Sequence, residues 1–435
     1  MTKLTNISLS RKTYPIRVWL LLFIGVSLFL PNGINSLAII ALFLHWFFFV
    51  PNIEKLENFK RKKKYLFLLL SFYLINGISF FYSDDRDSGL FDLQVKLSLF
   101  IFPIVLLCQN GLNLEEIKKI LYWFSTGVAF FSLIAIVISI FKYGELFANQ
   151  ELAHLIGLHA SYYSLFVALS IFVILEIFLE KKATLIHFII LALLLFMISL
   201  LASRSIIIGL FILTVIWFSL IRFNKKNLFF SSLTIVLITL FCLSFKPIRN
   251  RFYEAVDSKD FVELDAPLNE HKTLGKTYGG RAIRFAIWQC SFDLIKENWI
   301  LGVGTGDTQN KLQESYKTHT FEFAYLYNRY NAHNLFIQTI ISSGILGLVS
   351  IVSILTFLVF ISIKIKSITS FAFSLLFIFI SLVEASLNVQ SGVVFFALFS
   401  SIFVSNYLGL SANFIKKDSL KPPKSAMNLN SNSPI

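Results

Sequence analysis

Three arginines have the residue type and the setting to bind a phosphorylated ligand. Arg281 and Arg284 lie one helical turn apart, directly after two glycines. The free backbone N–H groups of a helix start and two guanidinium groups together suit a phosphate dianion. Arg204 interrupts an apolar run, where facing lipid would cost on the order of 3 kcal/mol, so we expect it to face a polar cavity or an anion. The simpler interpretations are a solvated helix face for the pair and a lipid-headgroup anchor for Arg204.

Three further side chains could move a proton or contact a substrate. His333 precedes Asn334 at the predicted start of a helix, and a neutral imidazole near pH 7 is a suitable general base for a sugar hydroxyl. A helix cap or structural donor is the alternative role. Glu384 stands near the outer end of an apolar segment, where a carboxylate usually has a function. The alternative is that its short loop exposes Glu384 to water. His159 opens a stretch of Tyr and Ser residues that fits either an interfacial belt or a rim that contacts sugar.

The remaining patterns predict neither a cofactor nor a metal ion. Gly302, Gly304 and Gly306 are spaced like a nucleotide-binding loop, but no strand pattern precedes them, so they predict a tight turn. The three cysteines show no metal-ligand spacing with each other or with histidine. We therefore expect no cofactor and no metal.

The elements that must position these residues are mostly apolar. Of the 435 residues 56% are hydrophobic and 15% are charged, and the mean hydropathy is +0.72. This composition is typical of a polytopic membrane protein and excludes an ordinary water-soluble domain. The net charge of +14 arises from short basic clusters between apolar runs. Such a distribution indicates membrane topology, with membrane lipids and not nucleic acid as a partner.

The predicted fold class is an all-α polytopic membrane protein with about twelve transmembrane helices. A span needs about 20 apolar residues, and fewer where the helix is short or oblique. The candidate spans lie near 16–31, 35–50, 65–81, 90–107, 120–140, 160–179, 183–201, 206–221, 228–245, 344–363, 367–383 and 391–408. Only a Pro-Asn-Gly turn separates the first two, so whether both cross fully stays open.

The basic residues also predict the orientation. If the N-terminus is cytoplasmic, the inside segments hold 23 Lys and Arg residues, whereas the short outside loops hold three. The positive-inside rule then places both termini in the cytoplasm. Arg204, Arg281 and Arg284 consequently share the outer side, which favours a joint binding role.

One outer segment, residues 246–332, differs in kind because it carries 12 basic and 11 acidic residues. Ile283, Ile287 and Cys290 begin the apolar face of an amphipathic helix, and Trp288 lies on a neighbouring face with the two arginines of this segment. The predicted organisation is spans one to nine in 1–245, a large, partly helical periplasmic loop in 246–332, a periplasmic helix start with spans ten to twelve in 333–410, and a disordered cytoplasmic tail in 411–435.

In the combination and order of its motifs the chain resembles the O-antigen ligase and O-antigen polymerase superfamily of bacterial envelope proteins. The first motif is Ser203-Arg204 at the outer end of a mid-chain span. The second runs from Gly280-Arg281 through Ile287-Trp288 and Asn298 to the glycines between 302 and 306. The third is His333-Asn334, followed by Ile337-Gln338, Gly344 and Gly347-Leu348. The large outer loop and the stretch from Glu384 to Phe396 fit the same family, so the resemblance covers roughly residues 200–400.

The resemblance implies a GT-C-like glycosyltransferase of the bacterial cytoplasmic membrane with its active site on the periplasmic side. It would transfer a glycan from undecaprenyl diphosphate to an acceptor hydroxyl, on lipid A-core or another glycan, by inversion and without a metal ion. Arg204 and Arg281 would hold the diphosphate, with Arg284 beside them, and His333 would activate the acceptor. The accessory positions would be Glu384, His159, Trp288 and Asn334.

Two positions depart from the pattern of that family, and two other functions stay open. Trp299 stands where a proline usually follows the asparagine, and Ser342 stands where a glutamate is common.

A polymerase that extends one lipid-linked repeat with another would use the same donor chemistry. A transporter or flippase of lipid-linked sugars would instead place its charges near the membrane midplane, usually on inverted repeats.

Overall fold

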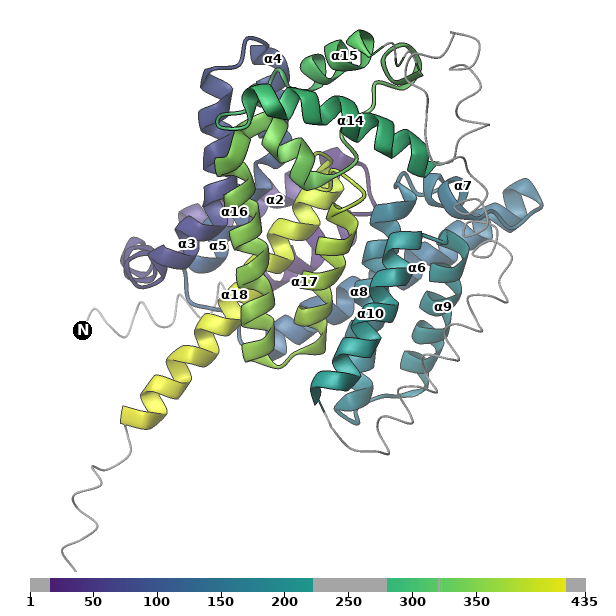
Figure 1. The fold of residues 1–435 in the computed structure, drawn as a ribbon. Helices are drawn as coiled ribbons and strands as arrows, with labels where there is room; N and C mark the ends of the chain where they lie inside the picture. Colours follow the sequence, from purple (N-terminus) through teal and green to yellow (C-terminus); the bar gives the residue numbers. More distant parts are fainter. Residues whose placement is uncertain (1–15, 222–279, 320, 322, 420–435) are drawn as a thin grey trace, which may run out of the picture.

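The computed structural model describes residues 16–221, 280–319, 321 and 323–419, and every regular element within them is a helix (Figure 1). Within these residues, seven helical segments are long and apolar enough to cross a membrane: α2 Asn32–Phe49, α3 Asn52–Phe81, α4 Arg86–Lys96 continued by α5 Ser98–Leu107, α6 Leu114–Tyr143, α8 Ala160–Leu179, α16 Leu335–Ile365 and α18 Gln390–Ser419. The shorter apolar helices are Ile16–Ser27, α9 Leu185–Leu201, α10 Arg204–Ile221 and α17 Ile368–Ser381. A short helix, α7 Asn149–His154, precedes α8.

Eleven of the twelve apolar segments predicted from the sequence fall on these helices, and the twelfth, 228–245, lies outside the described residues. The all-helical membrane fold is therefore confirmed, whereas the number of crossings stays a prediction. The tail predicted to be disordered from residue 411 begins as helix, because α18 continues to Ser419. No Pro or Gly interrupts the chain between Leu410 and Pro422, so nothing in the local sequence ends the helix earlier.

The core of the bundle is built by helices far apart in the sequence. α18 packs on α5, α8 packs on α6, α9 and α17, and α16 packs on α3 and α17. Phenylalanine rings fill the centre of these contacts. The ring centroids of Phe124 and Phe399 are 4.9 Å apart, and those of Phe166 and Phe395 are 4.8 Å apart. Such aromatic packing fixes α6 and α8 relative to α18.

A small group of helices lies across one end of the bundle: α14 Gly280–Asn298, α15 Thr308–Thr318 and the π-helix η1 Phe323–Asn328 (Figure 1). This outer group has its own hydrophobic cluster, in which Ile287 and Cys290 are fully buried and Ile283 is partly buried. The amphipathic helix predicted from the spacing of these three residues is therefore confirmed.

The outer group joins the bundle through a backbone clamp, in which residues 299–304 pair with residues 341–345 of α16. The N–H of Val303 donates to the carbonyl of Ile341 at 2.7 Å, and the N–H of Gly304 donates to that of Ser342 at 3.1 Å. These carbonyls are free to accept because α16 has non-helical backbone angles at Ser343 and Gly344.

The clamp explains why two of its positions are glycines. Gly302 has φ 74°, which confirms the predicted tight turn, and Gly344 has φ 63°. A Cβ at Gly302 would lie 2.6 Å from the amide nitrogen of Ser343, and one at Gly344 would lie 2.1 Å from the carbonyl oxygen of Ile300. Both contacts are with backbone atoms, so a side chain at either position would force the two segments apart.

A carboxylate makes the second attachment of the outer group. Asp307 accepts hydrogen bonds from the backbone N–H groups of Asp84 and Asp85, each at 2.8 Å. Beside it, Thr305 donates to the carboxylate of Asp92 in α4 at 2.6 Å. The outer group is thus tied to both the α3–α4 turn and α16.

Candidate functional site

Glu384 is the centre of a polar cluster at the end of the bundle that α14 crosses. Its Oε2 lies 3.3 Å from Nδ1 of His333. Its Oε1 lies 3.4 Å from Nη2 of Arg284 and accepts a hydrogen bond from Ser161 at 3.2 Å. The Glu384 side chain is 11% exposed. Four separate segments meet here: the start of α8, the helix α14, the turn before α16 and the loop after α17.

The loop after α17 holds Glu384 in place through its own backbone. The N–H of Glu384 donates to the carbonyl of Ile380 at 2.9 Å, which continues the helical bonding of α17 by one step. The carbonyl of Glu384 accepts from the N–H of Ser386 at 2.9 Å, and the hydroxyls of Ser381 and Ser386 are 2.8 Å apart. The carboxylate therefore extends from a short, internally bonded turn.

The backbone of His333 lies in the left-handed region, with φ 44°, and its neighbours hold it there. The indole N–H of Trp288 donates to the carbonyl of Ala332 at 2.9 Å, and the N–H of Ala332 donates to Oε1 of Gln338 at 2.9 Å. The N–H of His333 itself donates to Oδ1 of Asn331 at 2.9 Å. A non-glycine residue keeps such a conformation only where the surroundings over-determine it, as they do here.

Asn334 is a helix cap that also joins the histidine turn to the Glu384 loop. Its Oδ1 accepts from the N–H groups of Phe336 and Ile337 at 2.9 and 3.1 Å, which caps α16. Its Nδ2 donates to the carbonyl of Leu382 at 3.0 Å. Of the predicted accessory residues, Trp288 and Asn334 thus position the backbone on either side of His333.

The charges around Glu384 favour its ionised form. Burial raises the pKa of Glu384, but the hydrogen bond from His333 and the positive charges of His333, Arg284 and His159 together outweigh burial, so the pKa lies below its ordinary value. An ionised Glu384 can only accept a hydrogen bond, so the Nδ1 of His333 that faces it carries a proton. When the imidazole is neutral, its Nε2 is then the proton acceptor. This pairing can supply a general base.

His159 is the N-cap of α8, where its Nδ1 accepts from the N–H of Ser161 at 3.3 Å. Burial lowers the pKa of His159, and the Glu384 carboxylate offsets that shift only in part. In this structure His159 caps α8 and contacts the backbone of Ser161, whose hydroxyl donates to Glu384, and its accessory role stays a prediction.

Arg204 lies at the same end of the bundle as Glu384. Gly209 of α10 packs against Phe379 of α17, and Arg204 is five residues nearer the outer end. At 1.5 Å of rise per residue, that places it about 7 Å beyond the contact, in the direction of the Glu384 loop. Arg281 belongs to the first turn of α14, and its side chain lies outside the described residues. The convergence of Arg204 and Arg281 on His333 stays a prediction.

The structure adds residues that the sequence patterns do not single out. Tyr330 lies edge-on to His333, with ring centroids 5.4 Å apart, and burial raises the pKa of its phenol. Gln338 accepts from a backbone N–H six residues earlier in the chain, across a turn whose shape no periodicity reveals. Ser161 was visible only as part of a hydroxyl-rich stretch.

Within the described residues, no group of three or more His, Cys, Asp or Glu side chains is arranged to hold a metal ion. Residues 188–352 match the family model described as O-antigen ligase. No curated protein matches the chain. The matched segment contains Arg204, Arg284 and His333, whereas Glu384 lies beyond its end. The chain thus has the apolar helices of a multi-pass membrane protein and is similar to the O-antigen ligase family over residues 188–352, the resemblance that its motifs predicted.

Proposed function

We propose that this protein transfers a glycan from undecaprenyl diphosphate to an acceptor hydroxyl, as an inverting glycosyltransferase on the periplasmic side of the bacterial cytoplasmic membrane. The observation that carries the proposal is the contact of His333 with Glu384 beside Arg284. This contact lies where α16 begins and α17 ends. In this proposal a lipid-linked donor presents its diphosphate at the end of the membrane-spanning helices, where this cluster lies. The family match supports a glycan ligase or polymerase.

The base in this reaction is the His333 imidazole. Glu384 holds Nδ1–H, so Nε2 accepts the proton of the acceptor hydroxyl. The acceptor oxygen then forms a bond to the anomeric carbon on the face opposite the diphosphate. The bond from that carbon to the diphosphate oxygen breaks, and its electron pair leaves with undecaprenyl diphosphate. Attack from the opposite face inverts the anomeric configuration.

The arginines stabilise the charge that develops on the leaving diphosphate. One Nη of Arg284 faces Glu384, and the Arg284 side chain is 29% exposed. The exposed part of the guanidinium can therefore donate to a phosphate oxygen while the side chain stays attached to the site. Arg204 and Arg281 would bind the remaining oxygens. In this proposal three guanidinium groups supply the positive charge that many glycosyltransferases take from a metal ion.

The acceptor distinguishes a ligase from a polymerase. A ligase would use lipid A-core or a similar glycan, and the description of the matched family favours this function. A polymerase would use a second lipid-linked repeat with the same donor chemistry. A transporter would leave the glycosidic bond intact. Transporters usually bind their substrate near the membrane midplane, whereas this polar cluster lies at the end of the helix bundle. Its position therefore favours a transferase.

The test is a reconstituted transfer reaction. Purified protein in lipid is mixed with a lipid-linked glycan and lipid A-core, and the release of undecaprenyl diphosphate is measured beside the glycosylated acceptor. We expect both products, and neither with His333→Ala, which should still bind the donor. If the wild-type protein releases no undecaprenyl diphosphate with any glycan acceptor, transfer is contradicted.

A gene deletion then separates the two transferases. Loss of a ligase leaves a ladder of unligated lipid-linked polymer. Loss of a polymerase instead leaves single repeats on the surface glycan, and this outcome would replace the ligase assignment.

A further inference from the structure

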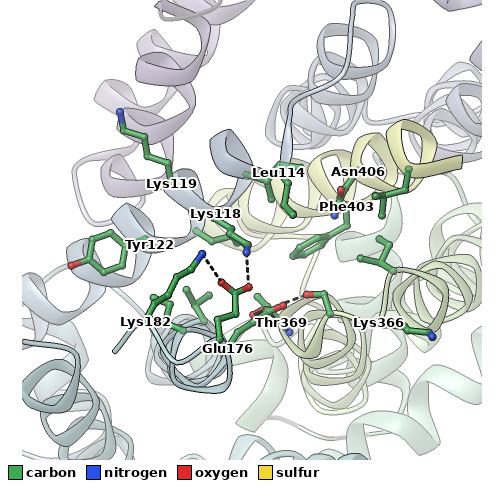
Figure 2. A pocket seen from close by; sticks show the side chains of 18 of the residues that line it. Leu114, Lys118, Lys119, Tyr122, Glu176, Lys182, Lys366, Thr369, Phe403 and Asn406 are labelled. Carbon is green, nitrogen blue, oxygen red and sulfur yellow. Dashed lines mark hydrogen bonds and ion pairs between the residues drawn. The ribbon is translucent and has the colours of Figure 1, made fainter. Parts of the chain in front are cut away.

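A cavity lies at the opposite end of the bundle from Glu384. Its volume is about 620 Å³, and it is lined by residues of α6, α8, α9, α17 and α18 and of the α16–α17 turn (Figure 2). Three helices connect the two ends. The caps of α8 are His159 and Glu180, the C-cap of α16 is Lys366, and α17 leads from Ile368 toward the Glu384 loop. The 20 residues of α8 are about 30 Å long, which is the thickness of the hydrocarbon core.

The cavity has an excess of positive charge. Four lysines line it against two glutamates: Lys118, Lys119, Lys182 and Lys366 with Glu176 and Glu180. The ammonium groups of Lys118 and Lys182 converge on the single carboxylate of Glu180, and that of Lys182 lies 3.5 Å from it. Two positive charges therefore meet one negative charge at the rim of the cavity, where the side chains of Lys118 and Lys182 are 41% and 72% exposed.

The second glutamate is occupied by α17. The Oε2 of Glu176 accepts from the hydroxyl of Ser367 at 3.1 Å and from the N–H and hydroxyl of Thr369. The start of α17 thus occupies the Glu176 carboxylate, so the local positive excess around Lys118 and Lys182 persists.

The walls of the cavity are apolar. Leu121 and Ile117 of α6, Val173 and Ile177 of α8 and Phe403 of α18 line it. A small inorganic anion would satisfy the lysines but leave these walls uncovered. A ligand with a phosphate and a hydrocarbon chain fits both parts, as basic pockets between transmembrane helices fit anionic lipids.

We propose that this cavity binds an anionic phospholipid of the surrounding membrane. Its phosphate lies between Lys118 and Lys182, and an acyl chain follows the apolar wall. The proposal rests on the charge and lining of the cavity and is independent of the transfer reaction at the other end.

The first experiment measures lipid binding by native mass spectrometry of the full-length protein in detergent. Phosphatidylglycerol, phosphatidylcholine and inorganic phosphate are titrated separately. We expect a retained phosphatidylglycerol adduct with little phosphatidylcholine. Equal retention of the two lipids would overturn the proposal, as would inorganic phosphate displacing phosphatidylglycerol at equal concentration.

Variants that change the charge balance in opposite directions separate binding from misfolding. Each lysine near a lipid phosphate contributes about fivefold in affinity, so Lys118→Gln with Lys182→Gln should weaken phosphatidylglycerol binding by about 25-fold. Glu180→Gln removes the competing carboxylate and should strengthen binding. The matched control is Lys60→Gln with Lys63→Gln, exposed lysines of α3 at the same end. Unchanged affinity in both the double variant and Glu180→Gln would contradict the site.

Discussion

The proposed role of Glu384 as the counter-ion of His333 can be tested by Glu384→Gln. A glutamine has the same shape and accepts a hydrogen bond, but it carries no charge. In Glu384→Gln the imidazolium that forms at His333 loses its counter-ion. We expect kcat to fall by roughly 100-fold, with little change in KM for the donor. Steady-state kinetics check this. Ser161→Ala removes another partner of Glu384 without changing its charge and should cost far less; similar losses in both variants would point to packing and not to charge.

The lowered pKa of Glu384 also predicts a pH dependence of stability. The folded state favours the ionised form, so this carboxylate stabilises the protein above its unfolded pKa, near 4.5, and the stabilisation is lost as the pH falls through the lower folded pKa. As the pH is lowered from 6 to 3, the midpoint temperature of thermal unfolding should therefore fall more steeply for the wild type than for Glu384→Gln. Parallel curves would show that the group is not coupled to folding.

For single residues, the sequence predicts which side chains are reactive better than it predicts which residues they contact. His333, Arg284 and Glu384 are visible as reactive side chains in an apolar chain, because such residues are costly there without a function. Their meeting is not visible, since Glu384 lies 51 positions beyond His333 and outside the family match. The left-handed backbone of His333 was also hidden, because it depends on bonds made by Trp288 and Gln338 from other elements.

Trp288 connects α14 to the turn that holds His333, through the hydrogen bond from its indole N–H to the carbonyl of Ala332. This bond can be removed with little change in the size of the side chain. Trp288→Phe deletes the N–H that holds the Ala332 carbonyl while it keeps an aromatic ring. We expect a roughly tenfold lower kcat, because small displacements of a catalytic group are costly. Trp299→Phe is the control, since that indole is 53% exposed. Equal kinetics of the two variants would remove Trp288 from the positioning role.

The glycine in the break of α16 predicts a defect in folding. Gly344→Ala places a methyl group 2.1 Å from the carbonyl oxygen of Ile300, at a positive φ. We expect a loss of more than about 2 kcal/mol, seen as a lower midpoint of thermal unfolding. Gly77→Ala in α3 is the matched control, because nothing lies within 4 Å of its added Cβ. A wild-type midpoint for Gly344→Ala would contradict the clamp geometry.

Among the elements, helices were predictable and their breaks were not. The apolar spacing of Ile283, Ile287 and Cys290 identified α14 because one face of a helix must be buried. The interruption inside α16 at Ser343 and Gly344 leaves no hydropathy signal, since apolar residues continue on both sides.

For the molecule as a whole, the attachment of the outer helices determines whether Arg284 stays beside Glu384. Asp307→Ala leaves the N–H groups of Asp84 and Asp85 without their acceptor. We expect faster proteolysis within α14 and α15 and a lower transfer rate, with the membrane helices still folded. Asp293→Ala is the control, because among the described residues that carboxylate pairs with Lys296 and His319, both on the outer group itself. Equal proteolysis rates for both variants would argue against the attachment.

The backbone clamp determines which sequence changes this architecture tolerates. Its bonds run between main-chain atoms, so side chains at most of its positions are free to vary, whereas one inserted residue between 299 and 304 would shift every bond out of register. Trp299 illustrates the point. Its carbonyl accepts from the N–H of Ile345 at 2.9 Å, and a proline, the usual residue of the resembled family, keeps that carbonyl. The departure at this position therefore leaves the joint intact, and chain length across it is the stricter constraint.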